Sequence, residues 1–551
     1  MGRAGKVFLM RMSFKELKDE VAKIVPKGFD YSVELEAGDI AIVTSQPERF
    51  AADGLIGRIA KRVRRTIVLR PSEDIMVTPA EAKRSIEDIL PESAGLKHVY
   101  FDACLREITL ICDDPGEAVG RRGAVLNEIR DATGWLVRVE RTPPVLSKTI
   151  HDIRGYREAN ATERRKLLKN FGLNIHRPTR PGTAWARVTA LGSYREVGRA
   201  CHLITTNESR VMIDVGVNIA SDTDPMPYFT APEALPLDKL DAVVLTHAHL
   251  DHAGMLPVLF KYGYRGPVYC TPPTRDMMLL LQTDFLKVGG AEGKRAPYSM
   301  EDIRQCMLHV VDVDWGKTTD ITPDVKMTFE NSGHILGSSA VHLNIADGKH
   351  NIVFSGDQKY EKSWLFDAAN VRFPRCETLV IESTYGASGD YQPSREEATM
   401  ELQDIVTRTI ERGGKLVCPV FAVGRSQEVM IAIDDLFRAG NVKPVPVWLD
   451  GMIQEATAIH AAHPDYLTSS LKRSLLTDDG KNPFTSEWFR PVQGRELRES
   501  IIMDTSPCIV LATSGMMNGG PVMEYFKHWA SETRNSLCFV GYQAEGTLGR
   551  R

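Results

Sequence analysis

The sequence has few cysteines and no two of them in C-x-x-C spacing. Nine cysteines are scattered over 551 residues, so neither a zinc ribbon nor a disulfide framework is indicated. We interpret them as small apolar core residues in a reducing compartment. No apolar run is long enough to span a bilayer, and the opening "MGRAGKVFLMRM" is too short and too charged for a secretory signal. The sequence therefore predicts a cytoplasmic protein with no membrane partner.

The sequence also lacks a large excess of either positive or negative charge. It has 68 Lys and Arg residues and 72 Asp and Glu residues, which gives a net charge of −4. The whole-chain balance thus gives no sign of nucleic-acid binding. The basic residues nevertheless cluster in the first third of the chain, at 61–65, 121–122 and 164–169. Such runs are commonly solvated helix faces, yet this third is where we expect a polyanion to bind. The length alone predicts three or four domains.

The first 142 residues contain a repeat that is clearer in its pattern than in its letters. Each half reads as an amphipathic segment, two apolar strands, a G-x-x-G loop, a helix-like segment and a further strand. The halves span residues 12–75 and 76–143. In the KH fold such a loop lies between strand and helix, where its glycines let a nucleic-acid backbone approach. We therefore predict two KH-like α+β domains in tandem.

The two loops differ in what they offer to RNA. The second loop, Gly120-Arg121-Arg122-Gly123, places a basic pair between its glycines and resembles an RNA-binding KH loop. The alternative is an ordinary strand-to-helix turn, since a G-x-x-G alone has little specificity. The first loop, at 54–57, has apolar residues in the same two positions, so its domain is interpreted as a packing module.

After residue 143 the composition and the hydrophobic pattern of the sequence change twice. Residues 144–184 combine Pro-rich stretches with a basic helix-like segment and are interpreted as a linker or docking segment. Residues 185–388 repeat apolar strands that end in a polar residue or glycine, which is typical of an α/β domain. A second α/β pattern, at 389–551, has only three histidines. We expect this last domain to shape a substrate path and not to carry metal.

The nonapeptide "THAHLDHAG" at 246–254 has three imidazoles and one carboxylate within six residues. On a loop at a strand end, H-x-H-x-D-H spacing can direct two imidazoles at one cation and the Asp-His pair at its neighbour. Imidazole and carboxylate ligands suit Zn²⁺. A satisfied cluster of core histidines is the alternative, and it is difficult to build with this spacing.

Together with "SGHILGS" and "SGD" downstream, this motif resembles the metallo-β-lactamase superfamily. The resemblance implies a four-layer αβ/βα sandwich with two zinc ions at strand ends between two sheets. It also implies that an aspartate before the motif orients the ligands. The implied residues are His247, His249 and His334 for one zinc, Asp251 and His252 for the other, Asp357 as a bridge, and Asp214 as the orienting aspartate. Taken singly, His334 and Asp357 are ordinary loop residues.

The substrate is not chosen by the metals, because a two-metal site can attack phosphorus, a thioester or a lactam. The motifs "VIESTYG", "VFAVGRSQE", "TSGMMNGGP" and "GYQAEGTLGR" resemble the β-CASP nucleases, in which Glu382 is implied as the first acidic motif. With two KH-like domains in front, the chain is similar to the archaeal KH-containing β-CASP ribonucleases. The implied activity is endonuclease, and also 5′-to-3′ exonuclease, cleavage of RNA. A metal-activated hydroxide would leave 5′-phosphate and 3′-hydroxyl ends, in RNA 3′-end formation and transcription termination.

The sequence departs from the family pattern at its C-terminus. The family pattern continues with S-A-H-x-D and H-G-E motifs, whereas this chain stops at Arg551. The lookalike "AAHPDY" around His463 precedes "EGTLGR" and is interpreted as a decoy. We therefore expect a fragment or a naturally short form without the last lactamase strands. Its second zinc would lack a histidine ligand, which predicts weak or no catalysis.

Two other functions stay open. An RNA-binding scaffold with an inactive or incomplete lactamase core would carry one zinc or none, whereas the enzyme would carry two. A small-molecule hydrolase of the glyoxalase type would leave the KH-like repeat unexplained. The resemblance implies single-stranded RNA as the ligand and RNA polymerase or the termination machinery as a partner. It also implies a homodimer in intact members of the family.

Overall fold

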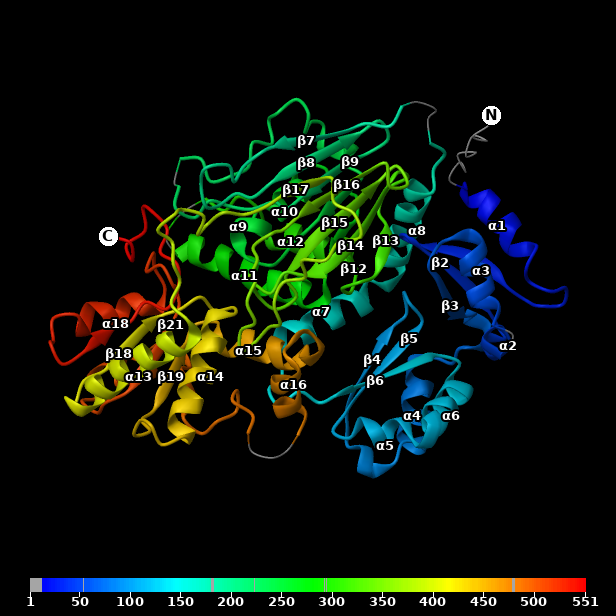
Figure 1. Ribbon diagram of the computed structural model, residues 1–551. Helices are drawn as coiled ribbons and strands as arrows, with labels where there is room; N and C mark the ends of the chain where they lie inside the picture. The colour runs from blue at the N-terminus through cyan, green and yellow to red at the C-terminus, as the bar shows by residue number, and fades with distance from the viewer. Residues whose placement is uncertain are drawn as a thin grey trace.

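The structure, a computed structural model, describes residues 12–52, 54–179, 183–221, 223–291, 293, 295–477 and 481–551. The opening residues 1–11 and residues 180–182 of the predicted linker lie outside the described residues. Figure 1 shows three regions: two small N-terminal units in blue and cyan, a green central region, and a yellow-to-red region beside it. No helix in the described ranges is both long and apolar enough for a membrane span.

The two N-terminal units repeat one topology of helix, two strands, two helices and a strand. Each has a three-stranded sheet in which the first two strands are antiparallel and the last two are parallel. The first unit has α1 (Phe14–Ala22), β1 (Ser32–Glu36), β2 (Asp39–Thr44), α2 (Pro47–Ala52), α3 (Leu55–Val63) and β3 (Ile67–Pro71). The second has α4 (Pro79–Ile89), β4 (Leu96–Asp102), β5 (Glu107–Cys112), α5 (Pro115–Val119), α6 (Ala124–Thr133) and β6 (Leu136–Arg141).

One detail of the predicted repeat was wrong. The G-x-x-G segments follow a helix and not a strand, because α2 and α5 precede them. The second lies between α5 and α6, whereas the first begins at the N-cap of α3 and continues into its first turn. Helices α2 and α5 have six and five residues, too few to show a helical period in the sequence. The first helices of both units were predicted from their amphipathic pattern. In the structure, Ser13 and Thr78 each begin one of them with a capping box that includes a glutamate.

The segment predicted as a linker or docking segment is a docked helical hairpin of α7 (Lys148–Ala159) and α8 (Ala161–Ile175). The backbone N–H of Ala37, in the β1–β2 turn, donates to the carbonyl of Leu168 at 2.9 Å. Gly172 approaches Leu35 so closely that an added Cβ would lie 2.5 Å from that side chain. On the other side, Arg157 donates to Asp312 at 2.6 Å. The hairpin thus holds the first unit against the central region.

The central region packs two sheets face to face, with strand orders β12-β11-β10-β9-β8-β7 and β13-β14-β15-β16-β17. Ile213, Val244 and Phe329 belong to the apolar layer between them. The first sheet has β7 (Ala186–Ala190), β8 (His202–Thr206), β9 (Arg210–Ile213), β10 (Ala242–Val244), β11 (Val268–Cys270) and β12 (Val310–Asp312). The second has β13 (Thr318–Asp320), β14 (Val325–Asn331), β15 (Ser339–Ile345), β16 (His350–Phe354) and β17 (Thr378–Val380). The helices are α9 (Leu250–Ala253), α10 (Leu256–Lys261), α11 (Pro272–Ala291) and α12 (Met300–His309).

The last region is a parallel sheet of order β20-β19-β21-β18-β22 with helices on both faces. Ligands of such sheets bind at the carboxyl ends of the strands, and in this chain those ends turn toward the central region. The strands are β18 (Leu416–Pro419), β19 (Val447–Asp450), β20 (Phe489–Pro491), β21 (Ile509–Ala512) and β22 (Ser536–Leu537). The helices are α13 (Arg395–Glu411), α14 (Arg425–Arg438), α15 (Ile453–Ala462), α16 (Ser469–Leu476), α17 (Gly494–Met503) and α18 (Pro521–Trp529).

Candidate metal centre and nucleic-acid interface

Four loops at the strand ends of the central region bring the predicted ligands together. Asp214 follows β9, the nonapeptide follows β10, His334 lies between β14 and β15, and Asp357 follows β16. His249 forms the N-cap of the short helix α9, so Asp251 and His252 leave the first turn of that helix. The predicted metal ligands, although His247 and Asp357 are 110 positions apart in the sequence, therefore share one site.

The first group of ligand atoms fits a tetrahedral cation. One atom each of His247, His249, His334 and Asp357 lie within 4.8 Å of one another. His334 Nε2 lies 3.1 Å from His249 Nδ1 and 3.5 Å from an Asp357 carboxylate oxygen. His247 Nε2 lies 3.9 Å from the same oxygen. Ligands on a tetrahedral zinc with bonds of about 2.1 Å are roughly 3.4 Å apart, which agrees with these separations.

A second group lies directly beside the first. Atoms of His247, Asp251 and His252 also lie within 4.8 Å of one another. His252 Nε2 is 3.8 Å from Asp251 Oδ2 and 3.1 Å from Asp357 Oδ1. Asp357 thus directs one oxygen at each group, which is the geometry that a carboxylate bridging two cations requires.

Asp214 holds the loop that contains Thr246 and His252 in place through hydrogen bonds. Its Oδ1 accepts the backbone N–H of Thr246 at 2.7 Å, and its Oδ2 accepts the Thr246 hydroxyl at 2.8 Å. Its Oδ2 also lies 2.8 Å from His252 Nδ1. Since a carboxylate can only accept, Nδ1 carries a proton, and when the ring is neutral, as a metal ligand must be, the lone pair of Nε2 faces the site. Thr246 contributes to this arrangement, and sequence reasoning missed its role because a single threonine after a strand has no distinctive signal.

The electrostatics of the site favour a cation. Burial, reinforced by neighbouring imidazoles, lowers the pKa of His247 well below its usual range and that of His249 to about 4, so both are neutral at pH 7. Burial alone would also lower the pKa of His252, but Asp357 and two further carboxylates outweigh it and raise that pKa well above its usual value. The carboxylates therefore favour positive charge where the two groups meet.

One buried nitrogen among the candidate ligands has no hydrogen-bond partner, and a bound cation would provide one. His247 is fully buried, and its Nε2 has no hydrogen-bond partner among the described residues. A buried imidazole nitrogen without a partner is costly in a folded protein. Nitrogen and oxygen donors at these separations suit Zn²⁺, so the residues present fit the predicted metal.

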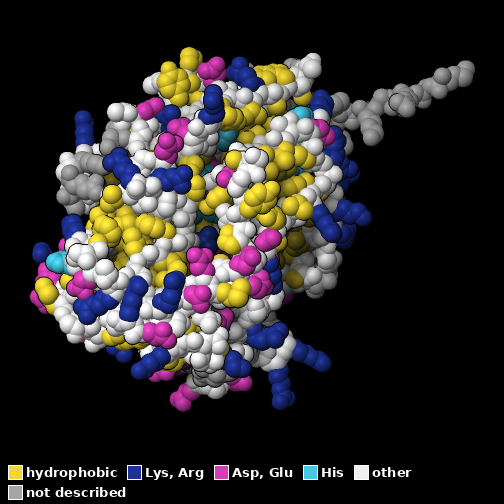
Figure 2. Space-filling model, turned by 60° about the vertical axis from the view of Figure 1, so that its left-hand side comes forward, with side chains coloured by type: hydrophobic (Ala, Val, Ile, Leu, Met, Phe, Trp, Pro, Cys, Tyr) yellow, Lys and Arg dark blue, Asp and Glu magenta, His cyan; other side chains and the backbone are white. Residues whose placement is uncertain are grey.

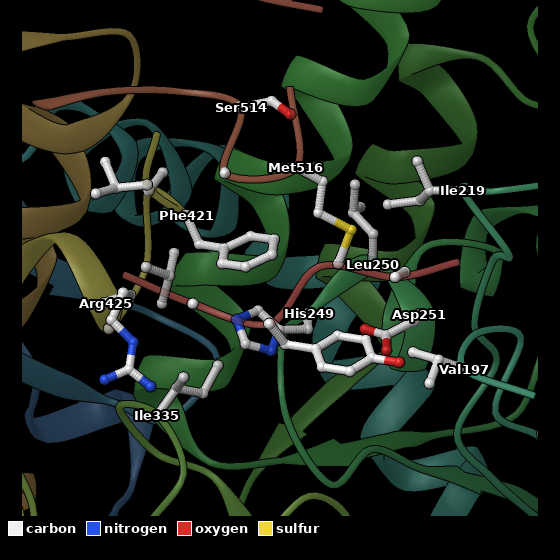
Figure 3. Close-up of a pocket in the computed structure, with 18 of the residues that line it drawn as sticks. Val197, Ile219, His249, Leu250, Asp251, Ile335, Phe421, Arg425, Ser514 and Met516 are labelled. Atoms are coloured by element: carbon white, nitrogen blue, oxygen red, sulfur yellow. The ribbon is translucent and has the colours of Figure 1, made fainter. Parts of the chain in front are cut away.

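The cluster opens into a cavity of about 2420 Å³ between the central and the last region. Figure 2 shows histidine side chains inside a hollow that is bordered by hydrophobic and basic groups. In Figure 3, His249 and Asp251 lie on one side of the pocket, with Phe421, Arg425 and Ser514 around them. The rings of Phe421 and His249 are 6.3 Å apart. The cavity is thus wide enough for a polymer and has aromatic rings close to the candidate metal centre.

Several lining residues beyond the predicted set are suited to nucleic acid. Tyr360 is 78% exposed and Tyr385 packs edge-on against Tyr542 at 5.8 Å. Lys359 and Arg425 add positive charge to the same wall. Lys359 and Tyr360 immediately follow the "SGD" segment, so their closeness to the metal motif was the available signal.

Glu382 lies in the wall of this cavity. Its Oε2 accepts the backbone N–H of Thr384 at 2.8 Å, and its own N–H donates to Ser355 Oγ at 3.1 Å. In the described chain it makes no hydrogen bond or ion pair with the histidine cluster. The structure therefore gives Glu382 the contacts of a turn-capping carboxylate at the edge of the candidate site.

His463, in the lookalike "AAHPDY", lies outside the cluster. It ends α15, and its Nε2 lies 2.7 Å from Asp276 of α11. Asp276 is fully buried and also accepts Arg275 Nε at 2.6 Å. His463 therefore connects the last region to the central one, as expected of a residue that only imitates the metal motif.

The second G-x-x-G loop presents its basic pair to solvent. Gly120 and Gly123 have φ of 71° and 79°, and a Cβ on Gly120 would lie 2.6 Å from Val125, so both positions favour glycine. Arg121 and Arg122 are exposed and form no ion pair within the described ranges. In the first loop, by contrast, Leu55 is fully buried.

Comparison with known proteins places these regions in families. The metallo-beta-lactamase superfamily matches residues 194–408, the Beta-Casp domain matches 426–551, and the KH domain of transcription termination factor FttA matches 11–76. A transcription termination factor FttA from Methanosarcina mazei is 50% identical over 97% of this chain and 84% of its own length. The chain belongs to the archaeal FttA family.

Other FttA proteins show the same extent of similarity. The one from Methanothermobacter thermautotrophicus is 46% identical over 98% of this chain and 85% of its own length. The one from Pyrococcus abyssi is 44% identical, with 98% and 84% covered. All six candidate ligands and Asp214 lie within the lactamase match, which confirms the predicted fold class for the part that holds the site.

Proposed function

We propose that this chain is a zinc-dependent ribonuclease that acts in RNA 3′-end formation and transcription termination. The observation that carries the proposal is a cluster of four histidines and two aspartates at a cavity between the lactamase and β-CASP regions, whose lining includes His249, His334, Asp251 and Asp357. Membership of the FttA family, whose members are named as termination factors, supports the role in transcription.

The proposed ligands follow from the distances. His247, His249 and His334 would hold one zinc, Asp251 and His252 a second, and Asp357 would bridge them, since its two oxygens face the two groups. When bound, the pair of ions supplies Lewis-acid activation of water and neutralises charge at phosphorus. Asp214 would fix the Nε2 atom of His252 toward the site.

The side chains of the cavity would position the RNA. Phe421 and Tyr360 offer ring faces on which bases stack regardless of sequence. Lys359 and Arg425 would meet the phosphates. Glu382, in the same wall, would hold or deliver a proton at the leaving oxygen, which requires its side chain to exchange the Thr384 contact for one with substrate.

The second KH-like unit would bind the single-stranded RNA before cleavage. Its glycines allow the backbone close to the loop, while Arg121 and Arg122 are free to contact phosphates. The same arrangement permits endonucleolytic and 5′-to-3′ exonucleolytic cleavage. RNA polymerase or the termination machinery, in the cytoplasm, is the proposed partner, and a homodimer the proposed assembly.

The test combines metal analysis with product analysis. Because Asp251, His252 and the bridging Asp357 are the proposed ligands of the second zinc, we expect that ion to bind more weakly than the first. We expect slow cleavage of a 5′-labelled single-stranded RNA to products with 5′-phosphate and 3′-hydroxyl ends. Asp251→Ala should abolish cleavage, whereas Asp404→Ala, on the exposed face of α13, should not change it. Two zinc ions without cleavage, or products with cyclic phosphate ends, would show that the proposed reaction is wrong. Thioester hydrolysis without RNA binding would favour a small-molecule hydrolase.

A further inference from the structure

Two cysteines that are distant in the sequence face each other on neighbouring strands of the β-CASP sheet. Cys418 lies in β18, and Cys538 directly follows β22. The strands are parallel with Val417 opposite Leu537, and the backbone N–H of Cys538 donates to the Val417 carbonyl at 2.9 Å. The next residue of each strand is therefore a cysteine, and the two are in register.

Both thiols point to the same face of the sheet. Cys418 and Cys538 pack in one apolar cluster, whereas Val417 belongs to the cluster on the opposite face. This is the alternation expected of a strand. Each thiol lies close enough to the other to shift its pKa. Neighbouring strands are roughly 4.8 Å apart, which lies within the Cα separation of about 4.4–6.8 Å that a disulfide spans.

The two thiols differ in access and in acidity. Cys418 is fully buried, whereas Cys538 is half-buried and lines the large cavity. The interaction with Cys418 lowers the pKa of Cys538 and is also the largest cause of the raised pKa of Cys418. Cys538 is thus the thiol that a small oxidant in the cavity would meet as the more reactive thiolate.

We propose that Cys418 and Cys538 are a redox-active dithiol that a hydroperoxide converts to an intrachain disulfide. The Cys538 thiolate attacks the peroxide O–O bond and becomes a sulfenic acid, with release of water or an alcohol. The Cys418 sulfur then attacks the Cys538 sulfur, the S–O bond breaks, and water leaves with the Cys418 proton. The two sulfurs are oxidised by two electrons in total, and the peroxide is reduced by two. Neither step depends on the proposed ribonuclease reaction.

The bond would form next to the RNA path. Cys538 is followed by Phe539, which is 40% exposed, and by Gln543, whose amide donates to the Gly515 carbonyl at 2.9 Å. Cys538, Phe539 and Gly515 line the cavity. A disulfide would fix the carboxyl end of β22 to β18 and so restrict this wall of the cavity.

The experiment uses the full chain, reduced and then freed of reductant. It is treated with hydrogen peroxide, blocked with N-ethylmaleimide and digested without reduction for mass spectrometry. We expect a linked peptide pair that contains Cys418 and Cys538 and is separated by dithiothreitol. Cys376, the only exposed cysteine in the described part of the chain, provides the control, and Cys376→Ser should keep the linked pair. Cys538→Ser should lose it.

Two results would overturn the proposal. One is full labelling of Cys538 by N-ethylmaleimide after peroxide treatment under which Cys376 is oxidised. The other is oxidation of Cys538 to sulfinic acid while Cys418 is recovered as a free thiol. Because the wild-type chain alone gives these results, the test does not depend on whether a variant at buried Cys418 folds.

Discussion

Asp214 connects three parts of the metal loop through one carboxylate. It accepts two hydrogen bonds from Thr246 and one from His252, and it adopts a φ of 59° that few residues other than glycine tolerate. This backbone conformation directs the Asp214 carboxylate toward the loop. The hydrogen bonds offset the free energy that the strained conformation costs. At the scale of single residues, the site therefore depends on a side chain that touches no metal.

We expect Asp214→Ala to weaken zinc binding about 10- to 100-fold, because His252 loses the partner that fixes its tautomer and ring. The measurement is zinc affinity in competition with a chromophoric chelator. Asp88→Ala, on an exposed face of α4, is the matched control and should bind zinc like wild type. Unchanged affinity in Asp214→Ala would show that the imidazole is held by packing alone.

The basic pair of the second G-x-x-G loop gives a second prediction at this scale. Replacing Arg121 and Arg122 together by alanine should weaken binding of single-stranded RNA and reduce the slope of log K against log salt by about 0.7 for each lost phosphate contact. Titrations at several salt concentrations measure both effects. Ile56→Ala in the first loop should leave both unchanged, and an unaltered slope in the double variant would contradict an RNA role for this loop.

At the scale of elements, buried charges connect helices from different regions. Asp276 of α11 pairs with Arg275 and with His463 at the end of α15, and Arg275 reaches Asp312 on β12 at 3.0 Å. Arg157 of α7 pairs with the same Asp312. Burial alone would raise the pKa of Asp276, but Arg275 and His463 outweigh it and lower that pKa to about 2. The network thus joins the docking hairpin, the lactamase region and the β-CASP region.

Asp276→Ala should lower the free energy of unfolding by roughly 3–5 kcal/mol, because it leaves buried charge without its partner. Urea unfolding followed by tryptophan fluorescence measures the change. Glu499→Ala removes an exposed pair with Arg495 and should cost less than about 1 kcal/mol.

The ion pairs of Asp276 also predict that the stability of the folded protein depends on pH. Because the pKa of Asp276 is lowered from 3.8 to about 2, its charge stabilises the folded protein above pH 3.8, and this contribution is lost as the pH falls toward 2. The difference in stability between wild type and Asp276→Ala should shrink over that interval. A difference that stays constant would mean that packing, and not charge, causes the loss.

At the scale of the whole molecule, the proposed RNA-binding loop and the proposed cleavage site lie in different regions. The second G-x-x-G loop belongs to the N-terminal units (Figure 1), whereas the histidine cluster opens into the cavity between the two later regions. The first unit is held by the α7–α8 hairpin and by Arg65, which lies 3.2 Å from Asp320. These contacts fix the first unit to the rest of the chain, and its role as a packing module stays a prediction.

Removal of metal should consequently separate the two activities. Treatment with EDTA should abolish RNA cleavage and leave RNA affinity within about twofold, since the phosphate contacts of the KH loop need no metal. Gel-shift and cleavage assays on the same sample measure both, and added zinc should restore cleavage. A parallel loss of affinity would place the main RNA contact in the metal cavity.

The sequence by itself determined the metal motif and the family. His247, His249, Asp251 and His252 leave a single strand-end turn, so their spacing along the chain already fixes which side chains can meet. The topology of the KH-like repeat was also predictable, since period-2 and period-3.6 patterns are local. The helices α2 and α5 were not, because one turn of helix contains too few apolar positions to show a period.

The resemblance had already named His334, Asp357 and Asp214, but only the tertiary structure decided how distant residues face one another. The two oxygens of Asp357 face separate groups, Phe421 approaches His249 from another region, and Cys418 faces Cys538 in sheet register. None of these contacts has a signature in the spacing of residues. They arise from strand order and from the packing of one sheet edge against another, which depend on the whole chain at once.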